Sequence, residues 1–201
     1  MIVTAIKRQV KRAGRVPVFI DGTYSFGLSD SALLESTLFV GQELSDREVK
    51  ALKGAADNDK LYGNAMRYAA MRVRSRWEIE QYLARKKCPA PLSATILSKL
   101  SEIGLIDDDA FAKAWVQNRK LLKPTSRRTL LQELRAKRVS EAAIEQVLAD
   151  EVDDDSVALK QLIAKKRAHY PDRQKFMQFL ARRGFRYDDI KHALAYDESD
   201  D

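Results

Sequence analysis

The sequence predicts a mainly α-helical protein, in which three tandem three-helix repeats form an elongated array after a small antiparallel β-hairpin or sheet and short helices. One observation behind this prediction is an apolar pattern, with spacings of four, ten and four residues, that occurs twice at a displacement of 46 residues. The other is that basic residues fill the gap between the apolar pairs in both copies. Apolar pairs at i and i+4 within a fixed period of this size are typical of stacked helical repeats. The apolar positions are Leu130, Leu134, Ile144 and Leu148, then Phe176, Leu180, Ile190 and Leu194.

A third copy of the pattern precedes these two and is three residues longer. Ile79, Leu83, Ile96 and Leu100 keep both four-residue steps but are separated in the middle by thirteen residues. We expect the extra residues to lie in a loop at 88–91, Cys-Pro-Ala-Pro, which can absorb them. The predicted divisions are a β-hairpin with helices at 1–59, three-helix repeats at 60–106, 107–152 and 153–196, and an acidic tail at 197–201.

The leading segment contains the alternating apolar runs of short strands. Residues 2–10 and 15–20 are predicted as two strands, and residues 24–28 alternate in a third. Asp21 and Gly22 lie between the second and third runs, and both residue types tolerate the positive φ of a type I′ turn. A sheet of about three strands is marginal alone, so it should pack on the helices that follow.

The next helix has a strong start signal. Ser45 and Glu48 form a Ser-x-x-Glu capping box, which satisfies two free amides at a helix N-terminus. We expect this helix to end near Asp57. A separate helix should begin at about Asp59 or Gly63 and end at the basic run that follows.

Similar signals mark the helices of the repeats. Acidic runs at 107–109 and 153–155 would meet the positive end of a helix dipole. Gly104 and Gly184 are expected just after helix ends, and the helix that starts at the second acidic run should reach about Ala168. The expected N-caps of the other helices are Ser29, Ser75 with Glu78, Ser126, Ser140 and Asp172.

Charge is distributed unevenly along the chain. Residues 1–59 hold eight Lys and Arg against eight Asp and Glu, whereas residues 60–196 hold 28 against 17. Such a field favours a polyanion or an acidic protein surface as partner, although a net charge of +7 also serves solubility alone. No apolar run approaches the roughly 20 residues of a membrane span, and the single Cys88 fits a reducing compartment. We therefore expect a cytoplasmic protein without a membrane partner.

The sequence offers no pattern of catalytic, metal-binding or cofactor-binding residues. His169 and His192 lack the spacing of a zinc site. The acidic runs at 107–109 and 153–155 lack the glycine and closing glutamate of a calcium loop, and helix capping explains them. A glycine-rich phosphate loop and a Gly-x-Ser-x-Gly elbow are also missing from the sequence. We predict a binding protein that is not an enzyme and uses neither a metal nor a cofactor.

Basic residues recur at matching places in the three repeats. One series lies around the junction of the first and second helices, and another follows the second helices. The planar fork of Arg binds phosphate or carboxylate in two-point contact. Each residue alone is better explained as a solvated helix end, but the series favours binding. The first series is Arg72, Arg74, Arg76, Arg119, Lys120, Arg127, Arg128, Lys165, Lys166, Arg167 and Arg173, and the second is Arg85, Lys86, Lys87, Arg135, Lys137, Arg138, Arg182, Arg183 and Arg186.

The two tryptophans could stack on nucleic-acid bases. Trp115 lies in an apolar i, i+4 pattern with Phe111, which favours a place in the core. Trp77 lies at a helix start beside Arg76, where both a stacking role and a packing role stay open.

Several motifs together resemble one known family. The run Asp-Asp-Ala-Phe-Ala at 108–112, followed by Trp115, Val116 and Arg119, resembles the most characteristic stretch of the RecX family, bacterial regulators of the recombinase RecA. The resemblance covers essentially the whole chain, and its specificity comes from the conjunction of short motifs. It departs from the family at 88–91. Further similar segments are Ser75-Arg76, Gly-Leu-Ile-Asp at 104–107, Gly-Gln-Glu-Leu-Ser at 41–45 and Arg-Arg-Gly-Phe-Arg-Tyr-Asp-Asp-Ile at 182–190.

The resemblance implies a specific activity. RecX proteins are built from tandem three-helix repeats, bind the RecA filament on single-stranded DNA and lodge in its helical groove. There they inhibit ATP hydrolysis and strand exchange, and so act in DNA recombination, DNA repair and the SOS response. The expected partners are the RecA filament and single- or double-stranded DNA, and the chain is expected to be a monomer. We expect the concave side of the array, with both basic series, to span neighbouring RecA subunits.

Two other functions remain compatible with the residues. One is an independent DNA-binding protein that uses a second-to-third helix pair as a helix-turn-helix. Against it, the repeats lack an evident recognition helix with base-reading Asn, Gln and Arg on one face. The other is a structural adaptor for acidic proteins. Direct DNA binding should weaken steeply with salt, even without RecA, whereas an adaptor should not bind DNA.

Overall fold

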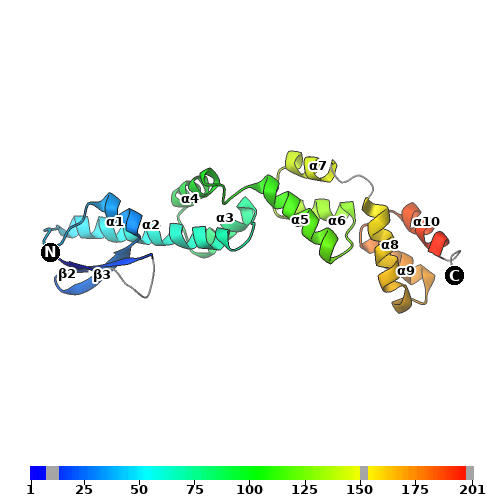
Figure 1. Cartoon of the computed structure of the whole chain (residues 1–201), viewed down its shortest axis with the longest axis horizontal. Helices are drawn as coiled ribbons and strands as arrows, with labels where there is room; N and C mark the ends of the chain where they lie inside the picture. Colours follow the sequence, from blue (N-terminus) through cyan, green and yellow to red (C-terminus); the bar gives the residue numbers. More distant parts are fainter. Residues whose placement is uncertain (8–13, 150–153, 198–201) are drawn as a thin grey trace. The chain divides into compact units, whose positions relative to one another are not determined.

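The computed structural model contains a three-stranded sheet and ten α-helices among the residues that it describes (Figure 1). The mainly α-helical fold with a small sheet is thus confirmed. The described residues are 1–7, 14–149 and 154–197. They belong to two compact units, the first made of residues 1–72 and 79–103 and the second of residues 73–78 and 104–201.

The sheet of the first unit is antiparallel in the order β1-β2-β3. It consists of β1 (Val3–Ile6), β2 (Val16–Ile20) and β3 (Thr23–Leu28). Asp21 and Gly22 join β2 to β3 with φ values of 47° and 80°, which confirms the predicted type I′ turn. β1 ends before the predicted position 10, and residues 8–13, which include the end of the first predicted strand, lie outside the described residues.

Two helices follow the sheet, α1 (Asp30–Ser36) and α2 (Asp46–Ala70). The predicted caps are confirmed, because Ser29 accepts a hydrogen bond from the α1 backbone and Ser45 and Glu48 form a complete capping box on α2. Residues from the strands and from α2 share one apolar core. Its buried members are Val3, Val18, Ile20, Phe26, Leu28, Leu44, Val49 and Ala56.

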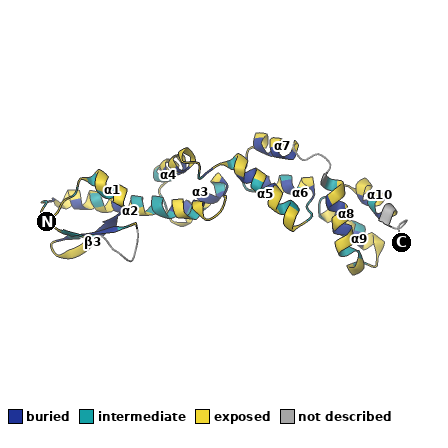
Figure 2. Cartoon of the chain, in the orientation of Figure 1, coloured by how far each residue is buried: buried dark blue, intermediate teal, exposed yellow. Residues whose placement is uncertain are grey.

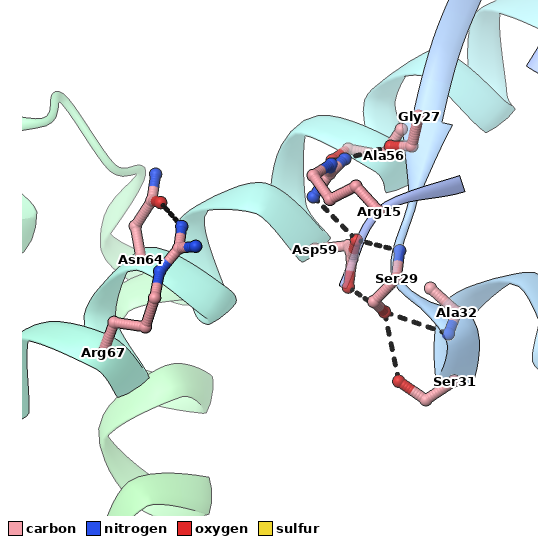
Figure 3. Close-up of polar contacts among 9 residues, drawn as sticks. All are labelled: Arg15, Gly27, Ser29, Ser31, Ala32, Ala56, Asp59, Asn64 and Arg67. Atoms are coloured by element: carbon pink, nitrogen blue, oxygen red, sulfur yellow. Dashed lines mark hydrogen bonds and ion pairs between the residues drawn. The ribbon is translucent and has the colours of Figure 1, made fainter. Parts of the chain in front are cut away.

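α2 continues for 25 residues, so the predicted end near residue 57 and the separate helix after it are wrong. The reason lies in the contacts of Asp59, which is inside the helix (Figure 3). Its carboxylate accepts hydrogen bonds from the Ser29 amide at 2.8 Å, the Ser29 hydroxyl at 2.6 Å and the Arg15 guanidinium at 3.0 Å. These bonds tie the sheet to the middle of α2, and such tertiary contacts outweigh a weak local preference for a break. The predicted division at 59/60 falls within α2 and stays a prediction.

The second and third helices of every repeat are joined by four residues. The pairs are α3 (Arg76–Arg85) with α4 (Ala90–Glu102), α6 (Arg127–Ala136) with α7 (Glu141–Ala149), and α9 (Arg173–Arg182) with α10 (Tyr187–Asp197). The predicted longer loop at 88–91 is therefore wrong, because the three extra residues lengthen α4 at its start. Pro91 lies in the first turn of α4, where proline is tolerated since a first-turn amide has no helical acceptor.

Each of these connections contains one residue in the left-handed region. The φ values are 56° at Lys87, 55° at Arg138 and 90° at Gly184. In the first two connections, the amide of the next residue donates to a carbonyl five residues earlier, at 3.1 and 3.2 Å. This is the Schellman pattern of a helix C-terminus. Glycine is the favoured residue at such a position, so Lys87 and Arg138 are held there at a cost.

The second unit holds two further three-helix cores. The first helices of these repeats are α5 (Asp108–Leu122) and α8 (Asp154–Lys166), and a 3-10 turn, η1 (Arg167–His169), follows α8. α8 thus ends slightly before the predicted Ala168. All twelve apolar positions of the predicted repeat pattern are buried, which confirms it. Figure 2 shows buried residues on the helix faces that turn toward their neighbours.

Among the helices that the structure describes, none has both the length and the apolar character needed to cross a lipid bilayer.

Candidate functional site

The acidic run at the start of α5 caps two helices. Asp107 accepts a hydrogen bond from the Ala110 amide at 2.9 Å, as expected for the N-cap of its own helix. Asp108 instead accepts from the backbone amide of Arg76, the first residue of α3, at 2.7 Å. Burial raises the pKa of the Asp108 carboxyl. The capping explanation of this run is therefore confirmed, but one of its carboxylates serves a helix of the preceding repeat.

The same contact recurs one repeat later. Asp155, at the start of α8, accepts from the backbone amide of Arg127, the first residue of α6, at 2.6 Å. This cap in trans is not predictable from the sequence, because nothing in the local spacing shows that residues 32 and 28 positions apart meet.

The start of α6 also packs on the end of α9. The hydroxyl groups of Ser126 and Thr129 both donate to the Arg183 carbonyl, at 2.8 and 2.9 Å. Gly184 follows directly, and a Cβ atom there would lie 2.5 Å from the Ser126 Oγ and 2.8 Å from the Thr129 Oγ1. Glycine is thus required twice at this place, for its positive φ and for the close approach.

The corresponding place at the start of α3 holds charged and aromatic side chains. The Lys137 ammonium lies 2.8 Å from the Glu78 carboxylate, 5.3 Å from the centre of the Trp115 ring and 5.8 Å from that of Trp77. The Trp115 indole donates to Glu133 at 2.8 Å, and its ring also packs on the apolar core of α5, α6 and α7. The packing role predicted for Trp115 agrees with this geometry. Lys137 is held by three side chains and presents little charge to a partner.

The predicted basic candidates differ in their contacts and in their exposure to solvent. Arg119 and Arg135 are ion-paired with Glu133 and Glu141, each at 2.8 Å, and Arg74 is only 8% exposed. The Arg127 guanidinium donates to a backbone carbonyl at the end of α7, and that of Arg167 donates to the Tyr170 carbonyl. The candidates that are exposed to solvent are Arg72, Arg76, Arg128, Arg138, Lys165 and Arg182, and those that are half-buried and not named above are Lys120, Lys166 and Arg183.

Two of the half-buried candidates meet in one pocket of the third repeat. Lys166 and Arg183 line it together with His169, Tyr170 and Phe179. In the sequence the two cations belong to different basic series, and His169 lacks the spacing of a zinc site. The sequence contains no signal for this pocket, because the spacing of its two aromatic residues, Tyr170 and Phe179, forms no recognisable pattern.

The described residues contain no group of three or more His, Cys, Asp or Glu side chains that could hold a metal ion.

Comparison with known families agrees with this arrangement. The RecX N-terminal domain matches residues 1–45, and the second and third three-helix domains of RecX match residues 107–148 and 153–194. A regulatory protein RecX from Levilactobacillus brevis is 32% identical to this chain, over 96% of the chain and 75% of the relative. The chain belongs to the RecX family.

Other RecX proteins support the same relation. A regulatory protein RecX from Bacillus pumilus is 29% identical over 97% of this chain and 78% of its own length. A crystal structure of a regulatory protein RecX matches with a TM-score of 0.75 at 27% identity, over 96% of this chain and 98% of that one. RecX from Lactobacillus salivarius matches with a TM-score of 0.61 at 23% identity, over 71% of this chain and 97% of that one, and supports the fold alone. The predicted tandem three-helix repeats and the RecX resemblance are confirmed.

Proposed function

We propose that this RecX-family chain is a non-catalytic regulator that binds in the groove of the RecA filament on single-stranded DNA. Bound there, it inhibits ATP hydrolysis and strand exchange by RecA, and so modulates recombination, DNA repair and the SOS response. The observation that carries the proposal is membership of a family whose relatives are named regulatory proteins, and the excess of basic side chains in the helical repeats adds to it.

Charge gives the proposal its physical basis. The repeats hold 28 basic against 17 acidic residues between positions 60 and 196. Exposed cations such as Arg128, Lys165 and Arg182 lie at the starts and ends of α6, α8 and α9. A filament groove that presents DNA phosphate and protein carboxylates would attract this field at long range.

The test is charge reversal that leaves the fold intact. Arg127, Arg135 and Lys137 are unsuitable because they bond to other parts of the protein. Replacement of Arg128, Lys165 and Arg182 by Glu should reduce inhibition of the DNA-dependent ATP hydrolysis of RecA at least about tenfold, as expected when several favourable charge interactions become repulsive.

A matched control carries the same charge change elsewhere. Arg47, Lys50 and Lys53 are exposed on α2, outside the candidate series. Replacement of these three residues by Glu should leave inhibition of RecA within about threefold of the original, since each exposed charge outside an interface contributes little. Equal losses in both variants would mean that only net charge matters. Tight, salt-sensitive DNA binding without any effect on RecA would instead favour an independent DNA-binding protein.

A further inference from the structure

The pocket in the third repeat has a wall that is part basic and part aromatic. Lys166, His169, Tyr170, Phe179 and Arg183 line a hollow of about 460 Å³. Pockets that bind small ligands have volumes of roughly 300–1,000 Å³. All five residues come from one stretch of the second unit, at the end of α8, in and after η1, and at the end of α9.

The pocket contains two cationic side chains, Lys166 and Arg183, beside the imidazole of His169. Within the described part of the chain, the side chains of Lys166, His169 and Arg183 form no ion pair with a carboxylate. By contrast, Arg119 of the first basic series is paired with Glu133, and Lys137 of the second is paired with Glu78. Among the described residues, therefore, no carboxylate competes with an external anion for Lys166 and Arg183.

The aromatic part of the wall is held in place by the core. The Tyr170 ring stacks on Phe179 with 4.8 Å between centroids and an interplanar angle of 28°, and on Phe176 at 5.3 Å and 20°. Phe176 is fully buried in the core of the repeat. The Arg183 guanidinium lies 5.2 Å from the centre of the Phe179 ring. The wall is thus ordered before any ligand binds, which lowers the entropic cost of binding.

We propose that this pocket binds one nucleotide of single-stranded DNA. Lys166, His169 and Arg183 contact the phosphate, and the base packs against Tyr170 and Phe179. The inference deepens the proposed function and rests on it for the biological setting, because it names the part of the filament that the third repeat contacts.

The chemistry of the wall favours single-stranded nucleic acid over other anions. Proteins that bind single strands combine positive charge along the backbone with aromatic side chains on which bases stack. Duplex DNA keeps the faces of its bases inside the stack, so it would leave the aromatic wall unused. An acidic peptide could bind the cations but would give Tyr170 and Phe179 no partner of matching shape.

The first experiment measures binding of a fluorescein-labelled oligothymidylate to the full chain without RecA. The variant Lys166→Gln/Arg183→Gln removes two charges from the pocket, and the control Lys160→Gln/Lys191→Gln removes two exposed charges from the same repeat, outside the pocket and outside both basic series. Lys191 is a suitable match because it also lies over an aromatic ring, that of Tyr187, at 5.4 Å. We expect about tenfold weaker binding for the pocket variant and less than about threefold for the control. The salt slope of the pocket variant should be shallower by about 0.7, because one phosphate of the single strand is no longer neutralised.

The second experiment tests the aromatic wall with a strand that has the same phosphates but no bases. The original protein should bind oligothymidylate about tenfold more tightly than an abasic strand of equal length, since base stacking on an aromatic side chain contributes about that factor. Tyr170→Leu should remove this preference while the circular dichroism spectrum stays unchanged. If that variant fails to fold, the comparison of the two strands on the original protein decides alone.

The outcomes separate this pocket from the proposed function. Equal affinity for both strands, equal losses in the pocket variant and its control, or no binding of the oligonucleotide at all would overturn the pocket assignment. Loss of RecA inhibition with unchanged oligonucleotide binding in the pocket variant would overturn it too, in favour of an acidic protein surface as the ligand. Pocket-dependent binding without inhibition of RecA by the original protein would support the pocket and refute the proposed function.

Discussion

Gly184→Ala places a methyl group where two hydroxyl groups already lie. The new Cβ would be 2.5 Å from the Ser126 Oγ and 2.8 Å from the Thr129 Oγ1, in a residue whose φ is 90°. Both hydroxyls donate to the Arg183 carbonyl. The start of α6 must therefore move away from the end of α9, and the two hydrogen bonds lengthen when it does.

The loss of stability has two parts. An alanine in the left-handed region costs about 1 kcal/mol relative to glycine. Each of the two hydrogen bonds to the Arg183 carbonyl contributes about 1 kcal/mol. We expect Gly184→Ala to lower the free energy of unfolding by about 3 kcal/mol in total.

Gly104→Ala separates the two parts. Gly104 also has a positive φ, 72°, but a Cβ there would meet no atom within 4 Å. This control should lose only the backbone contribution, about 1 kcal/mol. Urea denaturation followed by circular dichroism gives both values. Equal losses at Gly184 and Gly104 would show that α6 and α9 do not approach each other in solution as they do here.

Three further changes test other features of the structure. Arg138→Gly should raise the free energy of unfolding by about 1 kcal/mol, because glycine relieves the left-handed strain, and a lower urea midpoint would contradict this. Burial raises the pKa of Asp108, so the folded state binds that proton more tightly, and stability should fall as pH rises through the raised pKa. Asp108→Asn should remove this fall in a series of melting temperatures from about pH 4 upward, and an unchanged profile would exclude Asp108 as its source. Lys137→Met should cost about 2 kcal/mol, because it takes a charged partner from the largely buried Glu78; a double-mutant cycle with Glu78→Gln that gave no coupling would refute the pairing.

The local signals of the sequence were enough for most of the secondary structure. The apolar i, i+4 pairs at Leu130 and Leu134 and at Ile144 and Leu148 are all buried, because helical periodicity reports burial directly. The caps at Ser45 and Ser126 and the turn at Asp21 and Gly22 were also predictable, since a single side chain or backbone preference determines each of them.

Features that depend on distant residues could not be predicted in this way. The continuation of α2 past residue 57 depends on hydrogen bonds from Ser29 and Arg15 to Asp59. The positions of these three residues in the sequence do not indicate that they are in contact. The third-repeat pocket likewise needs Lys166 and Arg183 to meet across two helices. Of the basic candidates, sequence reasoning could not separate those with carboxylate partners, such as Arg119, from those without. Their role in binding stays a prediction.

The carboxylates at the starts of α5 and α8 also affect the order in which the chain can fold during synthesis. The N-terminal part of a chain leaves the ribosome first. α3 and α6 are therefore synthesised before Asp108 and Asp155, which bind their first amides. α9 differs, because its cap, Asp172, directly precedes it. The N-terminus of the second helix in each of the first two repeats is therefore capped by a residue of the repeat that follows. The growing chain should gain stability in steps, each step occurring when the next acidic run leaves the ribosome and caps the helix before it.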